Sequence, residues 1–214
     1  MSTNHDVAQP APLPDLLLRG KLVATLPDRA MPSLVAAVEV MVQEGIQALS
    51  LPVSHVEQVS RLRGIFGPRA SVGVHDVAGP DDLAGALDAG ADFVSLCGPD
   101  GELVARAKGA GCPVLVAALT PTEVRAAWQL GVSGVVVVPA EVMGSGYPEA
   151  LVALAPEATI CARGGLGAYS ARRWAEAGAV ALWLDEALIG DAFTSGSLGG
   201  LRERCQTFRT AVDD

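Results

Sequence analysis

The sequence predicts an α/β protein whose eight parallel strands alternate with helices and close into a (β/α)8 barrel, the TIM barrel. Short apolar runs rich in β-branched residues alternate with helical patterns along the whole chain. The chain has 214 residues, half of them apolar, which is enough for one sizeable core. An open, doubly wound sheet is the alternative. Five helical patterns end in a glycine directly before an apolar run, as expected after a helix: Gly45, Gly90, Gly111, Gly131 and Gly178.

The expected elements follow one another with short connections. After a short helix at residues 14–19, the strands are expected at residues 21–26, 46–53, 70–74, 91–96, 113–118, within 131–141, 158–162 and 179–184. Helices are expected at residues 32–44, from residue 54 onward, and at 80–89, 148–155, 169–177 and 198–212, with another between residues 120 and 131.

The run at residues 131–141 is the most distinctive of these strands. It is continuously apolar after Gly131 and stops at Pro139, which is typical of a strand buried on both faces. Glu141 therefore follows a strand end, where barrels carry their functional residues, and Val136 is expected in the interior or its mouth.

Two helices have a sequence signal for their first turn. Ser54 with Glu57, and Thr120 with Glu123, have the spacing of a capping box, in which each side chain satisfies an unpaired backbone amide. Pro121 adds a proline at the first helical position of the second box.

Composition excludes several classes of function. The formal net charge is -9, which argues against nucleic acid or an anionic membrane as a partner, and no apolar run reaches the roughly 18 to 20 residues of a membrane helix. Residues 1–10 lack the pattern of a secretory signal, so we expect a disordered tail, one domain at residues 11–214 and a cytoplasmic location. No CxxC spacing occurs, which indicates reduced, buried thiols at Cys97, Cys112, Cys161 and Cys205.

Polar residues gather directly after the expected strands. Because these ends converge at one rim of a barrel, carboxylates and an imidazole from different strands could act as acid and base or hold a divalent metal. A solvated acidic rim is the alternative. The residues concerned are His75, Asp76, Glu141, Asp185 and Glu186.

The segment Arg163-Gly164-Gly165-Leu166-Gly167 is a candidate site for an anion. Glycines before a helix expose backbone amides, and an arginine can grip a phosphate or carboxylate. Alternatively, the glycines only permit a tight turn, and Arg163 pairs with Asp185 or Glu186.

Six segments occur in the order and spacing of one enzyme family. They are residues 21–26, 45–51, 89–93, 119–124, 138–141 and 163–166. Through them the chain resembles the 2-keto-3-deoxy-6-phosphogluconate (KDPG) and 4-hydroxy-2-oxoglutarate (KHG) aldolases. The resemblance implies a barrel, usually a homotrimer, that cleaves small 2-oxo acids to pyruvate and an aldehyde through a lysine Schiff base.

The resemblance also identifies positions where this chain departs from the family. The position of the family's lysine holds Val136, and that of its catalytic glutamate holds Ser50. His75 and Asp76 replace a glycine-threonine pair, and Pro27 replaces an arginine often found after the first strand. The second phosphate loop reads Trp183-Leu-Asp-Glu186.

Three functions are therefore open. The first is a carbon–carbon lyase for a small 2-oxo acid that uses the acidic rim, as a metal site or as acid and base, instead of a lysine imine. The second is an inactive aldolase-like protein that serves as a ligand-binding, regulatory or scaffold subunit. The third is an aldolase with a lysine from a neighbouring subunit.

Overall fold

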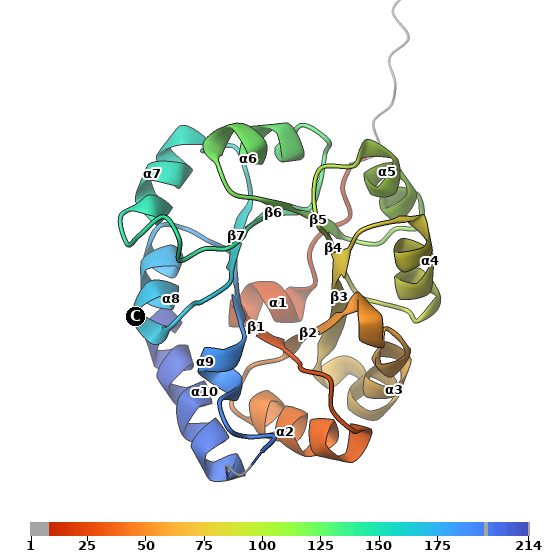
Figure 1. Cartoon of the computed structure of the whole chain (residues 1–214), viewed down its shortest axis with the longest axis vertical. Coiled ribbons are helices and arrows are strands. Elements are labelled where there is room, and N and C mark those ends of the chain that lie inside the picture. The colour runs from red at the N-terminus through yellow and green to blue at the C-terminus, as the bar shows by residue number, and fades with distance from the viewer. Residues whose placement is uncertain (1–8, 195–196, 214) are drawn as a thin grey trace, which may run out of the picture.

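The protein folds into a closed eight-stranded barrel, as predicted (Figure 1). The computed structural model describes residues 9–194 and 197–213; residues 1–8 of the predicted tail lie outside this part. The strands pair in parallel in chain order, and β8 closes the sheet against β1. They are β1 (Leu22–Thr25), β2 (Ala48–Pro52), β3 (Ser71–Val77), β4 (Val94–Leu96), β5 (Val114–Ala118), β6 (Gly134–Val137), β7 (Ile160–Arg163) and β8 (Ala181–Leu184).

Helices surround the barrel, and α1 lies across its far end in the view of Figure 1. The sequence analysis did not predict the one-turn helix α9, which directly follows the last strand. The helices are α1 (Asp15–Gly20), α2 (Met31–Gln43), α3 (Glu57–Phe66), α4 (Pro80–Asp88), α5 (Gly101–Gly109), α6 (Pro121–Trp128), α7 (Tyr147–Leu154), α8 (Ala168–Glu176), α9 (Glu186–Ile189) and α10 (Leu198–Asp213), with 3-10 turns at Val53–His55 and Gly67–Arg69.

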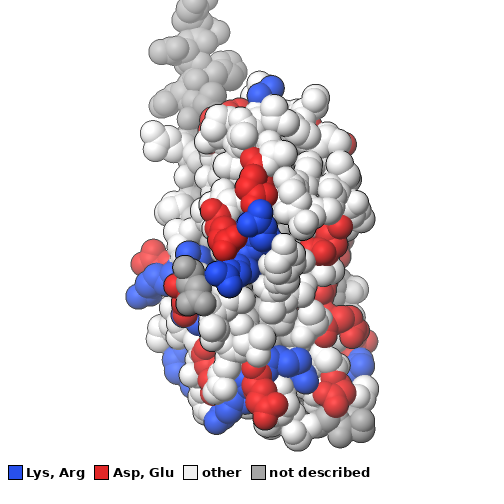
Figure 2. Space-filling model, turned by 90° about the vertical axis from the view of Figure 1, so that its left-hand side faces the viewer, with Lys and Arg blue, Asp and Glu red and all other residues white. Residues whose placement is uncertain are grey.

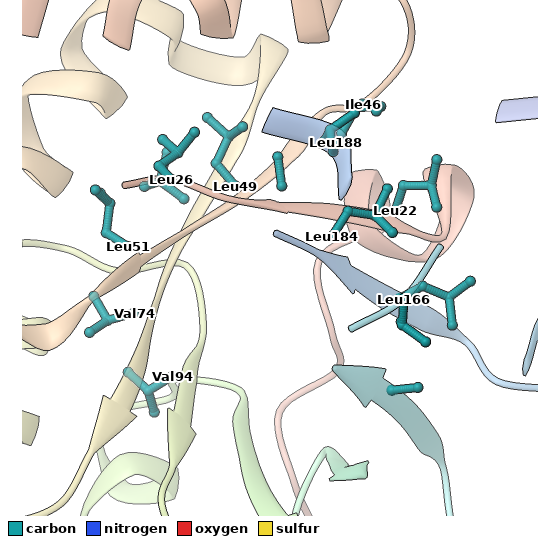
Figure 3. Close-up of a cluster of buried hydrophobic side chains, with 14 of the residues drawn as sticks. Leu22, Leu26, Ile46, Leu49, Leu51, Val74, Val94, Leu166, Leu184 and Leu188 are labelled. Carbon is teal, nitrogen blue, oxygen red and sulfur yellow. The ribbon is translucent and has the colours of Figure 1, made fainter. Parts of the chain in front are cut away.

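The larger core lies between the barrel and its helices. Figure 3 shows part of it, where leucines of β1, β2 and β8 are drawn with Leu166 and Leu188 from the segments outside the strands. Because strand residues alternate between the two faces of a sheet, the other residues of each strand point into the barrel. The barrel wall is therefore buried on both faces, as expected for parallel strands.

A second apolar cluster fills the inside of the barrel. Phe93 and Trp183 meet edge to face there, with ring centroids 6.0 Å apart. Leu13 and Leu17, from the α1 region, belong to the same cluster, so α1 plugs one end of the barrel. The remaining members are Val23, Ala48, Leu115, Val136, Cys161 and Ala181.

Only one of the two predicted capping boxes forms. Thr120 and Glu123 make both bonds of the box at the start of α6, with Pro121 in the first turn. The box predicted from Ser54 and Glu57 is wrong. Residues 53–55 form a 3-10 turn, so α3 begins only at Glu57, and the Ser54 hydroxyl bonds to Nδ1 of His55 instead, at 3.0 Å.

Charged side chains of opposite sign are interspersed on the face that carries α7, α8 and α10 (Figure 2). Arg173 pairs with Glu149 and Glu176, and Arg172 pairs with Glu176. On the described part of this face, the charges therefore form mixed groups instead of a basic surface for a polyanion. In residues 9–194 and 197–213, no helix is both long enough and apolar enough to cross a membrane.

Candidate functional site

The C-terminal ends of the strands surround a pocket of about 260 Å³, which we call the head pocket. Its polar side chains come from β3, β4, β7 and the end of β8, whereas the β5 and β6 side is apolar. The polar lining residues are Asp76, Ser95, Cys97, Arg163 and Asp185, and the others are Leu96, Ala117, Val136, Val138 and Gly164.

A bulge in β3 places Asp76 at this mouth, directly after the buried His75. The sequence analysis ended this strand at residue 74, but the strand continues to Val77. Val74 pairs with Val94, and Val77 pairs with Leu96. Between these two pairs, β3 therefore has one more residue than β4. Asp76 has a φ of 63°, a left-handed conformation that few residues other than glycine adopt. As a result, the side chain of Asp76 is 51% exposed at the mouth, whereas that of the preceding His75 is only 3% exposed.

His75 is a buried, neutral imidazole. Its Nδ1 lies 2.8 Å from Oγ of Ser50, and its Nε2 lies 3.7 Å from Oδ2 of Asp76. Burial lowers the pKa of His75 to about 4, the charge of Arg163 lowers it further, and the carboxylate of Asp76 opposes both. At neutral pH the imidazole is therefore unprotonated, and it is a weaker base than an ordinary histidine.

Arg163 crosses the mouth and pairs with Asp76. Two nitrogens of the guanidinium donate to the two carboxylate oxygens, at 2.7 and 3.2 Å. Partial burial acts to raise the pKa of Asp76, but the hydrogen bond and the charge of Arg163 hold it below its ordinary value. The alternative of a pair between Arg163 and Asp185 or Glu186 is therefore wrong, because the bulge brings the carboxylate of Asp76 within reach of the β7 end.

The glycine segment after β7 makes a tight, closely packed turn. Gly164 and Gly165 have φ values of 97° and 76°. A Cβ on Gly164 would lie 3.2 Å from Cα of Pro139, and one on Gly165 would lie 2.9 Å from Cγ of Glu141. Both the conformation and the close approach require glycine, which supports the tight-turn interpretation; whether the segment also binds an anion stays a prediction.

The acidic residues predicted for a metal site do not converge. In the described part of the chain, no group of three or more His, Cys, Asp or Glu side chains could hold a metal ion. Glu141 and Glu186 are exposed and do not line the head pocket, and Asp76 is engaged by Arg163. This donor set does not fit a divalent metal, so we derive no chemical step through one.

Sequence reasoning gave no functional role to two lining residues, Ser95 of β4 and Cys97 directly after it. Cys97 was expected in the core, but its side chain is exposed at the mouth. Partial burial and the nearby carboxylate of Asp76 raise the pKa of its thiol, so it stays protonated at neutral pH. Ser95 is buried and lines the same pocket. A period of two along β4 was the available signal, since inward residues of a strand are two apart.

A second hollow, which we call the side pocket, adjoins the head pocket. It measures about 320 Å³ and shares Cys97, Ala117 and Val138 with it. The two hollows therefore lie next to each other at the β4–β6 side of the mouth. The residues that line only the side pocket are Gly98, Pro99, Ala118, Leu119 and Glu123.

Neither lysine of the chain lines the mouth. Lys21 precedes β1 and lines a different hollow together with Arg172 and Asp213. Lys108 lies in the last turn of α5. Val136, where the resemblance places the family's lysine, is 1% exposed and belongs to the interior apolar cluster.

The closed (β/α)8 barrel has a polar pocket at the C-terminal strand ends. These two features are typical of the class of barrels that bind small molecules at this rim. The model of one family, KDPG and KHG aldolase, matches residues 15–193. The chain belongs to this family. No curated protein sequence matches it.

Solved structures of aldolases share the fold over nearly the whole chain. A 4-hydroxy-2-oxoglutarate/2-dehydro-3-deoxyphosphogluconate aldolase from TTHB1 is 26% identical, with a TM-score of 0.80 over 92% of this chain and 96% of that one. A native KDPGal structure is 22% identical, with a TM-score of 0.80 over 90% and 94%. A KDPG aldolase from Legionella pneumophila, with pyruvate captured as a covalent carbinolamine, is 17% identical, with a TM-score of 0.76 over 90% and 96%.

Proposed function

We propose that this protein is a carbon–carbon lyase that acts on a small 2-oxo acid by a mechanism other than a lysine imine. The observation that carries the proposal is the head pocket, which combines the cation of Arg163, the carboxylate of Asp76 and the neighbouring neutral His75 but has no lysine in its lining. A carbinolamine like that of the Legionella relative would require an amine in the mouth.

The proposed mechanism begins when the substrate carboxylate or 2-oxo oxygen approaches Arg163 in competition with Asp76. A base, His75 acting directly or through Asp76, accepts the proton of the 4-hydroxyl group. The C3–C4 bond then breaks, the aldehyde leaves, and the electron pair moves to an enolate whose oxygen is stabilised by the guanidinium. Return of the proton to C3 of the enolate gives pyruvate.

The glycines after β7 take part in this mechanism, whereas Glu141 does not. Gly164 and Gly165 are proposed to present backbone N–H groups to the bound anion beside Arg163. Glu141 is not part of the proposed proton transfer, because it is exposed and does not line the head pocket.

Pyruvate release from 4-hydroxy-2-oxo acids tests the lyase. We expect release by the natural protein, a loss of at least about 100-fold in Arg163→Gln, and little change in Arg172→Gln, a matched arginine outside the head pocket. In parallel, borohydride is added with pyruvate, and the protein mass is measured. An unchanged mass agrees with the proposal, whereas a pyruvyl adduct on a lysine would restore the imine mechanism.

A second candidate is a protein that binds a small acid without converting it. The bidentate Arg163–Asp76 pair favours it, because the one cation of the head pocket is already neutralised. Binding of pyruvate detected by calorimetry, with no release from any 4-hydroxy-2-oxo acid, would select this candidate.

The assembly and location are part of the proposal. By resemblance to the family we propose a homotrimer and a cytoplasmic location. Light scattering tests the trimer, since a monomer mass of 21.9 kDa predicts a particle three times heavier.

A further inference from the structure

We propose that the ligand of this mouth is a 2-oxo acid with an apolar, uncharged tail, whose head lies against Arg163 in the head pocket and whose tail fills the side pocket. This inference rests on the proposed function, because it assumes that a 2-oxo acid binds at Arg163. It adds the class of substituent that the site selects.

The position of the two hollows side by side defines the direction of the tail. Cys97, Ala117 and Val138 line both of them, so the tail of a ligand held at Arg163 would pass these three residues toward the β5 side. The side pocket, at about 320 Å³, lies at the lower end of the roughly 300 to 1,000 Å³ that sites for whole drug-sized ligands measure, so it has room for a tail of several heavy atoms.

The walls of the side pocket offer little to a charged tail. Pro99, Ala118 and Leu119 are apolar, and no arginine, lysine or histidine lines this hollow. Its single charged residue, Glu123, accepts bonds from the backbone N–H groups of Leu119 and Thr120, at 2.9 and 2.8 Å. A phosphate or second carboxylate on the tail would meet an anion here and lose its hydration without gaining a cation, which is unfavourable.

The mouth itself adds to this selectivity. Arg163 and Asp76 neutralise each other, which leaves the carboxylate of Asp185 as a further anion of the head pocket. One carboxylate of a ligand can replace Asp76 on Arg163. A second anionic group has no cationic side chain in the lining of either hollow.

The side pocket is held in shape before a ligand arrives. The hydroxyl of Tyr147 donates to the carbonyl of Leu119, and the capping box of α6 fixes the next residue, Thr120. A preformed apolar hollow binds an apolar tail without the cost of ordering a loop.

Calorimetry with 2-oxo acids that lack a 4-hydroxyl group tests this inference without any turnover. The probes are pyruvate, 2-oxopentanoate, 2-oxohexanoate and 2-oxoglutarate. We expect roughly 4-fold tighter binding for each buried methylene. We also expect 2-oxoglutarate to bind at least about 10-fold more weakly than 2-oxopentanoate, which has the same chain length.

If 2-oxoglutarate binds as tightly or more tightly, or if tail length has no effect, the inference is overturned while the head site stands. If no 2-oxo acid binds, the proposed function itself fails.

A single cation in the wall of the side pocket should reverse the preference for 2-oxopentanoate over 2-oxoglutarate. Gly98→Arg adds one to the side pocket, and a Cβ on Gly98 would have no atom within 4 Å, so the change fits the fold. We expect 2-oxoglutarate to bind more tightly to this variant than 2-oxopentanoate does. The matched control is Gly64→Arg in α3, where a Cβ is equally unobstructed and the preference should stay as in the natural protein. An unchanged preference in both variants would overturn the assignment of the tail to the side pocket.

Discussion

At the scale of single residues, the protonation state of His75 determines whether the imidazole can accept or donate a proton. The imidazole is buried and bonded to the Ser50 hydroxyl, and it lies beside an ion pair whose positive and negative ends act on it in opposite directions. Such an imidazole is unprotonated at neutral pH, and it can act as an acid only after it has taken a proton from another group.

The neutral state of His75 predicts how stability depends on pH. Its folded pKa of about 4 lies below the ordinary value of 6.5, so the unfolded chain takes up this proton first as the pH falls. The contribution of the neutral His75 to the free energy of unfolding is present in full above pH 6.5. It is lost as the pH falls from 6.5 to about 4. It amounts to about 3 kcal/mol.

Urea unfolding of the natural protein and of His75→Gln between pH 7.5 and 4.5 measures this effect. The natural protein should lose more free energy of unfolding than the variant across that window. Curves that run parallel would show that the pKa of His75 is not depressed.

The backbone of Asp76 allows a second test at the residue scale. Both Asp76→Gly and Asp76→Ala remove the ion pair with Arg163, but only glycine relieves the φ of 63°. We expect Asp76→Gly to be about 1 kcal/mol more stable than Asp76→Ala. Asp81, in the first turn of α4, is the control: there alanine should be the more stable replacement. Equal stability of the two Asp76 variants would contradict a strained bulge.

At the scale of elements, the two helix starts with the same sequence signal differ in the structure. The α6 box forms because Thr120 is extended and directly precedes the helix. Ser54 lies inside a 3-10 turn, where its hydroxyl has no access to the first amides of α3.

The two boxes therefore predict different costs for the same kind of substitution. Thr120→Ala should lower the free energy of unfolding by about 1 kcal/mol, because it leaves a backbone amide without its cap. Ser54→Ala should change it by less than about 0.5 kcal/mol. Chemical denaturation of both variants measures the difference; a similar cost at the two positions would mean that Ser54 does cap α3.

At the scale of the whole molecule, the barrel interior is a packed plug below the mouth. Phe93 fits there only because Gly73 lacks a side chain: a Cβ on Gly73 would lie 2.2 Å from the ring. The ring in turn meets Trp183 on the opposite side of the barrel. The size of the side chain that one strand can carry in the interior thus depends on side chains from distant strands.

Adding one methyl group at this place should disturb the whole barrel. We expect Gly73→Ala to lower the free energy of unfolding by about 1 to 3 kcal/mol through overpacking. In a Phe93→Leu background the same change should cost less, because the smaller side chain leaves room. Gly64→Ala in α3, with open space around the added group, is the control and should be neutral or stabilising. Equal costs of Gly73→Ala in the two backgrounds would contradict the contact with Phe93.

The sequence by itself determined the barrel, the order of its strands and most of its helices. These follow from local patterns: β-branched runs, glycines after helices, and the proline in the first turn of α6. It also placed Arg163, His75, Asp76 and Asp185 near one rim, since residues after parallel strands converge in any barrel.

Only the tertiary structure decided what these side chains do to one another. The β3 bulge depends on pairing with β4, and it is this bulge that brings Asp76 to Arg163, whereas regular pairing of β3 with β2 brings His75 to Ser50. The position of the two hollows side by side likewise depends on neighbouring strands. Local patterns specify where a strand begins and ends, whereas contacts between strands far apart in the chain arise only when the barrel closes.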